Sequence, residues 1–125
     1  MFNSKILFVA LLASGSLFAG SAENLIAENG CLGCHAIASR KAAPAFAGIG
    51  KRNKMLYSSN AKAIIVKSIK NGSSGKYRRF SSSAMPAFSN FSDKELNILA
   101  DYILAQSSKA KGHGGGRGRN FKGKF

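Results

Sequence analysis

Residues 31–35 are Cys-Leu-Gly-Cys-His, and this pentad constrains the chain more than any other feature. If the segment is helical, Cys31 and Cys34 lie three residues apart on one face, and His35 follows Cys31 by about one turn. Two thiols in that arrangement can add to the two vinyl groups along one edge of a porphyrin, and the imidazole can reach the iron. The C-x-x-C-H spacing therefore predicts one covalently attached haem c.

Three alternative roles for the cysteine pair stay open at this point. A dithiol redox site expects strands alternating with helices, and the sequence shows no such alternation. A structural zinc site needs four ligands, but the chain offers only the pentad and the remote His113. A disulfide between Cys31 and Cys34 is permitted in an oxidising compartment, although it leaves His35 without a role.

The N-terminus has the composition of a secretory signal peptide. A lysine precedes a continuous apolar run at residues 6–12, and residues 14–22 are rich in small side chains. We expect cleavage near Ala22, with cleavage after Ala19 or Ser21 as alternatives. An uncleaved membrane anchor is the competing interpretation, but the apolar run is shorter than the about 20 residues that a span needs. The sequence thus predicts export.

The remaining pattern predicts short helices and contains no clear strand. A first helix ends at Asn29-Gly30, and a short helix covers residues 51–57. A further helix runs over residues 60–71, with Asn60 as its N-cap and Gly72 at its end. Residues 39–50 and the long polar segment from residue 72 to residue 90 are expected to be loops, and a loop of the latter length tends to be functional or disordered.

The final helix is the clearest element. Ser92 and Glu95 form a capping box at its start. Apolar residues then repeat at helical spacing and define its buried face; they are Leu96, Leu99, Ala100, Ile103 and Leu104. The chain is therefore expected to be all-α.

Charge is distributed unevenly along the chain. Residues 29–92 contain eleven Lys or Arg and no carboxylate, and the formal net charge is +14. This excess predicts acidic partners and association rates that fall with salt. Residues 109–125 add six Lys or Arg, six Gly and no acid, a composition typical of disorder. Because an exported protein rarely meets nucleic acid, we expect this tail to make weak contact with an anionic membrane surface, an acidic protein partner or the cell envelope instead.

A haem held by His35 needs either a second axial ligand or an open position. A methionine thioether raises the reduction potential, whereas an open site favours gas binding or catalysis. Met55 lies in a predicted helix and is expected in the core. Met85 lies in the long loop and is followed by Pro86, which would stiffen the backbone there. Met85 is therefore the candidate for the second axial ligand, with an exposed loop methionine as the alternative.

With these features the chain resembles class I bacterial monohaem cytochromes c, the small periplasmic electron carriers, over residues 23–106. The resemblance rests on the pentad, an Ala-Pro-Ala-Phe stretch at residues 43–46, Asn71-Gly72 and Met85-Pro86. It implies an all-α fold of short helices wrapped around one haem c. The expected organisation is a signal peptide at 1–22, a haem domain at 23–107 and a disordered tail at 108–125.

The resemblance also implies specific roles. The carbonyl of Pro44 is expected to accept a hydrogen bond from the ring N–H of His35 and so orient it. The helix bearing Tyr102 is expected to cross the N-terminal helix. Relatives often have a tryptophan near the position of Tyr77 and a glycine at the position of Ala43, so the chain departs from the family pattern at both places.

The function implied is transfer of single electrons between respiratory partners in the periplasm. The sequence contains no carboxylate pair, Ser-His arrangement or phosphate loop that would suggest an enzyme. The expected partners are donor and acceptor redox proteins with acidic docking surfaces, such as a terminal oxidase. Two alternatives stay open: a haem subunit of a larger periplasmic oxidoreductase, and a haem enzyme or sensor with an open iron site.

Overall fold

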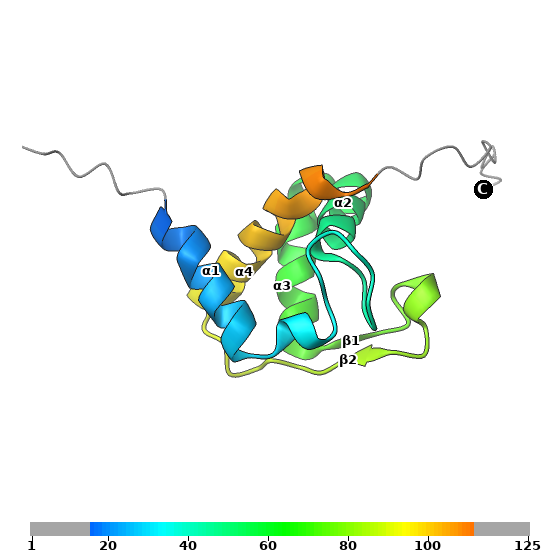
Figure 1. Ribbon diagram of the computed structural model, residues 1–125, viewed down its shortest axis with the longest axis horizontal. Coiled ribbons are helices and arrows are strands. Elements are labelled where there is room, and N and C mark those ends of the chain that lie inside the picture. The colour runs from blue at the N-terminus through cyan, green and yellow to red at the C-terminus, as the bar shows by residue number, and fades with distance from the viewer. Residues whose placement is uncertain (1–15, 112–125) are drawn as a thin grey trace, which may run out of the picture.

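The computed structural model describes residues 16–111, with side chains from residue 21 onward. The apolar run of the expected signal peptide, most of the basic tail and His113 lie outside the described residues. Within them the chain forms short helices joined by loops and tight turns (Figure 1). The helices are α1 (Ser16–Glu28), α2 (Phe46–Tyr57), α3 (Ala61–Asn71) and α4 (Asp93–Ala105). The all-α prediction is confirmed in outline.

Helix α4 is the element around which the others pack. It contacts α1, α2 and α3, and Figure 1 shows it lying against α1. The apolar face predicted for this helix is buried apart from Leu104, which is partly buried. The buried core comprises apolar side chains from all these helices: Ile26, Phe46, Ile65, Ile69, Leu96, Leu99, Ala100 and Ile103.

The start of α4 has the capping box that the sequence predicts. The backbone N–H of Glu95 donates to Ser92 Oγ at 3.1 Å, and Ser92 Oγ donates to Glu95 Oε1 at 3.1 Å. The first bond satisfies one of the backbone N–H groups that the first turn of a helix leaves without an intrahelical partner, and the second joins the two side chains.

Helix α2 begins at Phe46, five residues before the predicted start at residue 51. Its N-cap, Ala45, offers no side-chain acceptor. The first N–H groups donate instead to carbonyls of the preceding loop, Phe46 to Ala36 and Ala47 to Ile37, each at 2.9 Å. Because these acceptors are separated from the helix by a loop, local sequence patterns do not reveal them.

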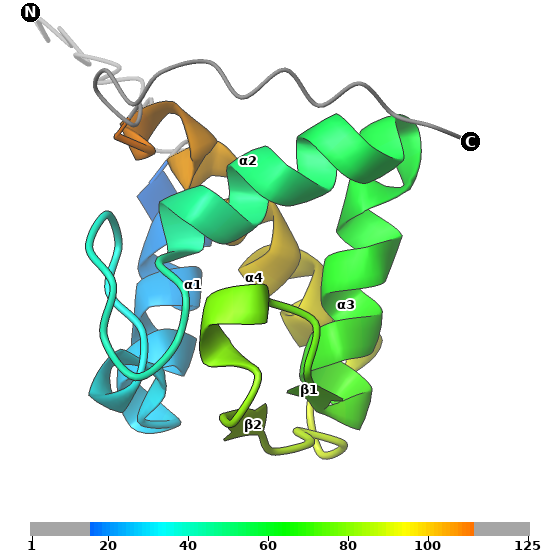
Figure 2. The same ribbon diagram turned by 90° about the vertical axis from the view of Figure 1, so that its right-hand side faces the viewer.

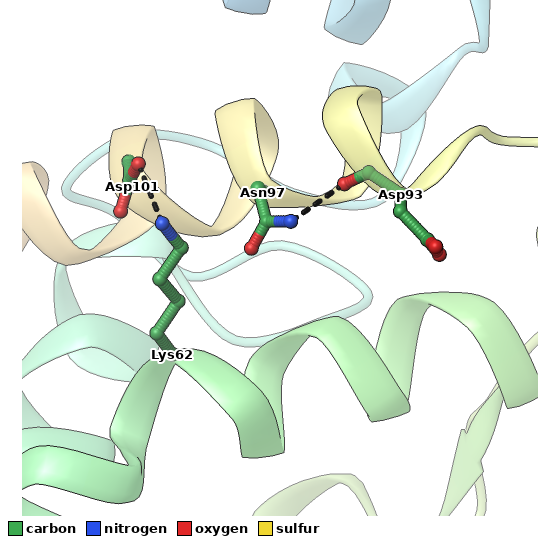
Figure 3. Close-up of polar contacts among 4 residues, drawn as sticks. All are labelled: Lys62, Asp93, Asn97 and Asp101. Carbon is green, nitrogen blue, oxygen red and sulfur yellow. Dashed lines mark hydrogen bonds and ion pairs between the residues drawn. The ribbon is translucent and has the colours of Figure 1, made fainter.

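Helix α3 begins at Ala61, directly after the predicted N-cap position, but without the expected side-chain cap. Asn60 precedes the helix but makes no side-chain cap, because a short 3₁₀ turn, Ser58–Asn60, leads directly into it. The predicted end at Gly72 is confirmed, with a positive φ of 78°. An exposed ion pair joins α3 to α4, from Lys62 Nζ to Asp101 Oδ2 at 2.9 Å (Figure 3).

The long segment after α3 contains a two-stranded antiparallel ladder that the sequence did not suggest. Strand β1 (Ser73–Ser74) pairs with β2 (Ala84–Met85), with Ser73 opposite Met85. The strands are too short for an alternating pattern to appear in the sequence. Between them lies a 3₁₀ turn, Arg78–Phe80. The segment expected to be a loop, residues 72–90, is therefore folded back on itself by the ladder and lies beside the C-terminal end of α3 (Figure 2).

Helix α1 passes through the expected cleavage region. Ala22 lies within it and is only 1% exposed. In the part of the chain that the structure covers, no helix is both long enough and apolar enough to cross a bilayer. The predicted helix stop is present, since Gly30 takes a positive φ of 67° immediately before the pentad.

Candidate functional site

Two residues of the cysteine pentad and Met85 face one cavity. The cavity is walled mainly by apolar side chains of α1–α4 and of residues 80–91. Cys31, His35 and Met85 all line it, although Met85 is fifty residues from His35 in the chain. An apolar lining with a few polar groups is typical of cofactor sites.

The pentad forms a single helical turn. A 3₁₀ turn covers Cys31–Gly33, and the N–H of His35 donates to the carbonyl of Cys31 at 2.9 Å. The Cys31 thiol lies in the cavity wall, and burial raises its pKa despite an opposing backbone hydrogen bond. Cys34 is exposed, and both thiols are free. The turn thus carries two thiols and one imidazole; Cys31 and His35 line the cavity, and Cys34 does not.

His35 is held on two sides. Its Nδ1 lies 2.6 Å from the carbonyl oxygen of Pro44, and its ring stacks on Phe46 with centroids 5.1 Å apart and planes 20° apart. Because a carbonyl can only accept, Nδ1 must carry the proton. The imidazole is 8% exposed. This arrangement leaves Nε2 with its lone pair free, the form in which histidine binds metals.

The two candidate methionines are placed very differently. Met85 is partly buried against the core and lines the cavity, held by its pairing with Ser73. Met55 is 72% exposed on α2, so the expectation that it packs in the core is wrong. Helix α2 buries the face that carries Phe46, Gly50 and Asn53, and helical spacing places Met55 on the opposite face.

The comparisons with known proteins agree with this arrangement. The family model described as "Cytochrome c" matches residues 22–107, most of the chain. The chain belongs to the cytochrome c family. It is accordingly a small c-type cytochrome that carries one covalent haem c and transfers electrons.

Individual relatives cover nearly the same part of the cytochrome. It is 34% identical over 103 residues to cytochrome c-551 of Pseudomonas aeruginosa, covering 78% of this chain and 93% of the relative. It is also 34% identical over 104 residues to cytochrome c-552 of Hydrogenobacter thermophilus, covering 81% of this chain and 96% of the relative.

Solved structures support the same fold. Nitrosomonas europaea cytochrome c552 superposes with a TM-score of 0.58 at 30% identity, over 67% of this chain and 98% of that one. The class 1 cytochrome MtoD from Sideroxydans lithotrophicus ES-1 superposes with a TM-score of 0.56 at 19% identity, over 71% of this chain and 96% of that one. The latter likeness concerns the fold alone.

One end of the cavity in this cytochrome is polar. Lys76 Nζ donates to Ser68 Oγ at 2.9 Å, and Asn53 Nδ2 donates to the Tyr77 hydroxyl at 3.3 Å. Desolvation lowers the pKa of Lys76, with a smaller effect of the Arg52 charge, and desolvation raises the pKa of Tyr77. Of these groups, only Tyr77 stood out in the sequence. The others come from elements that pack together only in the folded chain.

The residues present fit a haem. The apolar walls suit the flat macrocycle, while the polar end supplies N–H and O–H donors for its carboxylates. The exposed Arg78 and Arg79 are not among the residues lining the cavity. No group of three or more His, Cys, Asp or Glu within residues 16–111 gathers where it could hold a metal ion. A structural zinc site built on the pentad therefore has no support in this part of the chain.

Proposed function

We propose that this cytochrome is a periplasmic single-electron carrier whose haem is attached through Cys31 and Cys34 and ligated axially by His35 and Met85. The observation that carries the proposal is the shared cavity: Cys31 and His35 reach it from one part of the chain and Met85 from another. A methionine facing the cavity favours a closed electron-transfer iron over an open catalytic or sensing site.

Bound haem supplies an iron that alternates between two oxidation states and so accepts or gives one electron. The protein's part is to hold its ligands in place. The Pro44 carbonyl fixes the tautomer of His35 and keeps Nε2 available, and the Phe46 ring limits rotation of the imidazole. A thioether from Met85 would raise the reduction potential.

At the polar end, the Lys76 ammonium and the Tyr77 hydroxyl are suited to bind the haem carboxylates. Both groups line the cavity, and the raised pKa of Tyr77 keeps its hydroxyl protonated as a donor. The core residues on the remaining walls exclude water, which strengthens these charge-assisted hydrogen bonds.

The surface around the pentad is suited to brief contact with redox partners. Cys34 is exposed, as are the apolar side chains of Leu32 (45%) and Ile37 (36%). Lys41 lies beside them, with Nζ donating to the Leu32 carbonyl at 2.9 Å. Apolar contact ringed by positive charge favours fast, weak association with acidic donor and acceptor proteins.

Export completes the proposal. We place a cleaved signal peptide at the N-terminus, and among the expected positions we favour cleavage after Ala19. Cleavage after Ala22 would remove a side chain that is 1% exposed within α1. Mass measurement of the mature protein decides between the two positions.

The basic tail would add weak attraction to anionic membranes. Binding to anionic vesicles by the full chain, but not by a protein of residues 20–107, would support that role.

The test of the function is a pair of measurements on the exported protein. Intact mass after acid–organic extraction should include one haem, and a redox titration should give one reversible one-electron wave. A colourless product with a disulfide between Cys31 and Cys34 would contradict the proposal. A haem that is released by extraction would contradict the thioether bonds alone.

A further inference from the structure

A second groove lies directly behind the haem cavity and is lined by positive charge. Pro44, Tyr77 and Phe80 form walls of both spaces. We call the second space the cationic groove, after the cations that line it: Arg40, Arg52 and Lys111. They come from the loop before α2, from α2 itself and from the segment after α4.

No carboxylate lines this groove to balance those charges. The acids among residues 16–111 all lie on α1 and α4, and the ion pair within that range joins Lys62 to Asp101. Concentration of unpaired cations in a concave surface produces a positive potential that attracts anions. The positive potential of the groove therefore favours binding of a negatively charged group from another molecule.

Arg52 is the cation in the groove whose position is fixed by another side chain. Its guanidinium carbon lies 4.7 Å from the centre of the Tyr77 ring, which holds the planar group in place. Arg52 as a whole is partly buried and lines the groove. The ligand group that best matches a guanidinium is a carboxylate, which can accept two parallel N–H bonds.

We propose that the cationic groove binds carboxylate side chains of an acidic redox partner. This inference rests on the proposed electron-carrier function and specifies where a partner is held. Because Pro44, Tyr77 and Phe80 separate the groove from the haem cavity, a docked carboxylate lies one layer of residues away from the haem site. The sequence beyond Lys111 adds four cations and no acid, which extends the same complementarity to a large acidic surface.

The test uses the holoprotein and poly-L-glutamate as the probe. Binding is measured by calorimetry at about 0.01 M salt, where the screening length is about 30 Å. The groove variant Arg40→Gln/Arg52→Gln is compared with Lys67→Gln/Lys70→Gln. The control removes the same charge from exposed positions on α3, outside the groove.

We expect the groove variant to weaken binding by roughly tenfold or more, since it removes charge-assisted hydrogen bonds. The control should weaken it by about threefold at most, and Arg52→Lys should keep part of the affinity because it keeps the charge. Equal weakening in groove and control variants would overturn the proposal, because net charge alone would account for the binding. Displacement of the probe by inorganic phosphate at an equal concentration of charge would also overturn it in favour of a small-anion site.

Two controls keep these outcomes interpretable. The single variant Arg40→Gln, at an exposed loop position, tests the groove even if substitution of Arg52 disturbs folding. The haem spectrum and the one-electron titration of the wild-type protein are recorded first. If those fail, the electron-carrier function is wrong. If they succeed and the groove variants still bind normally, only the docking site is wrong.

Discussion

The two sides of the haem cavity are built in contrasting ways. The histidine side consists of five consecutive residues in one helical turn, braced by the Pro44 carbonyl and the Phe46 ring. The methionine side consists of a segment closed by a two-residue ladder and by a hydrogen bond from Phe88 N–H to the Ile69 carbonyl at 2.9 Å. The histidine side is formed by residues that are close together in the sequence. The methionine side is held by contacts between residues that are far apart in the sequence.

The contrast has consequences for stability. His35 is buried, whereas the residues flanking Met85 at 81–84 and 86–87 are exposed. A segment with few buried contacts opens at lower free energy than the core around it. We therefore expect the methionine side to be the first to open, while the thioether bonds proposed at Cys31 and Cys34 keep the haem attached.

The largest expected effect concerns attachment itself. Cys31→Ala combined with Cys34→Ala should abolish stable holoprotein, because both thioethers are lost and the cavity loses its ligand. Measuring haem per protein in the exported fraction checks this. A haem content equal to that of the wild type would show that the pentad does not attach the cofactor.

A substitution at Gly72 should break the methionine side alone. Its φ is 78°, and an added Cβ would lie 2.8 Å from the Met85 carbonyl oxygen. We expect Gly72→Ala to cost at least about 1–3 kcal/mol in backbone strain and to weaken the thioether absorption band. Gly33→Ala is the matched control, since nothing lies within 4 Å of a Cβ at that position. Similar losses in both variants would contradict the contrast between the two sides.

Denaturant should separate the two sides without any substitution. As guanidinium concentration rises, the thioether band should disappear before the far-ultraviolet signal of the helices, because the exposed segment around Met85 opens before the core. Coincident transitions would mean that the methionine side is as cooperative as the helical core.

The smallest effect is expected at the Ser92 cap of α4, because neither Ser92 nor Glu95 lines the cavity. Ser92→Ala should reduce the free energy of unfolding by about 1 kcal/mol through loss of the bond to the Glu95 N–H. The thioether band of the folded protein should not change. Loss of that band in Ser92→Ala would imply that the start of α4 controls the position of Met85.

The sequence predicted the local features well and the non-local ones poorly. The pentad, the stops at Gly30 and Gly72 and the Ser92 capping box each depend on residues within a few positions of one another. The start of α2 was missed because its first N–H groups bond to Ala36 and Ile37 across a loop. The Ser73–Met85 pairing was missed because two-residue strands carry no recognisable alternation.

The same distinction applies to the site. His35 and the cysteines follow from spacing alone, and Met85 followed from its place before Pro86 and from the family resemblance. Lys76 and Asn53 carried no signal, because their relevance comes from being brought to one end of the cavity by different elements. Exposure of Met55 was missed because the predicted helix left out Phe46–Gly50, the residues that define the buried face of α2.

The central claim is that one haem binds between His35 and Met85, and the absorption spectrum of the oxidised protein tests it most directly. Wild-type and Met55→Ala proteins should both show the weak long-wavelength band of a thioether on ferric haem. Met85→Ala should lose that band and have a lower reduction potential, while retaining its covalent haem. An unchanged spectrum in Met85→Ala, or loss of the band in Met55→Ala, would contradict the account.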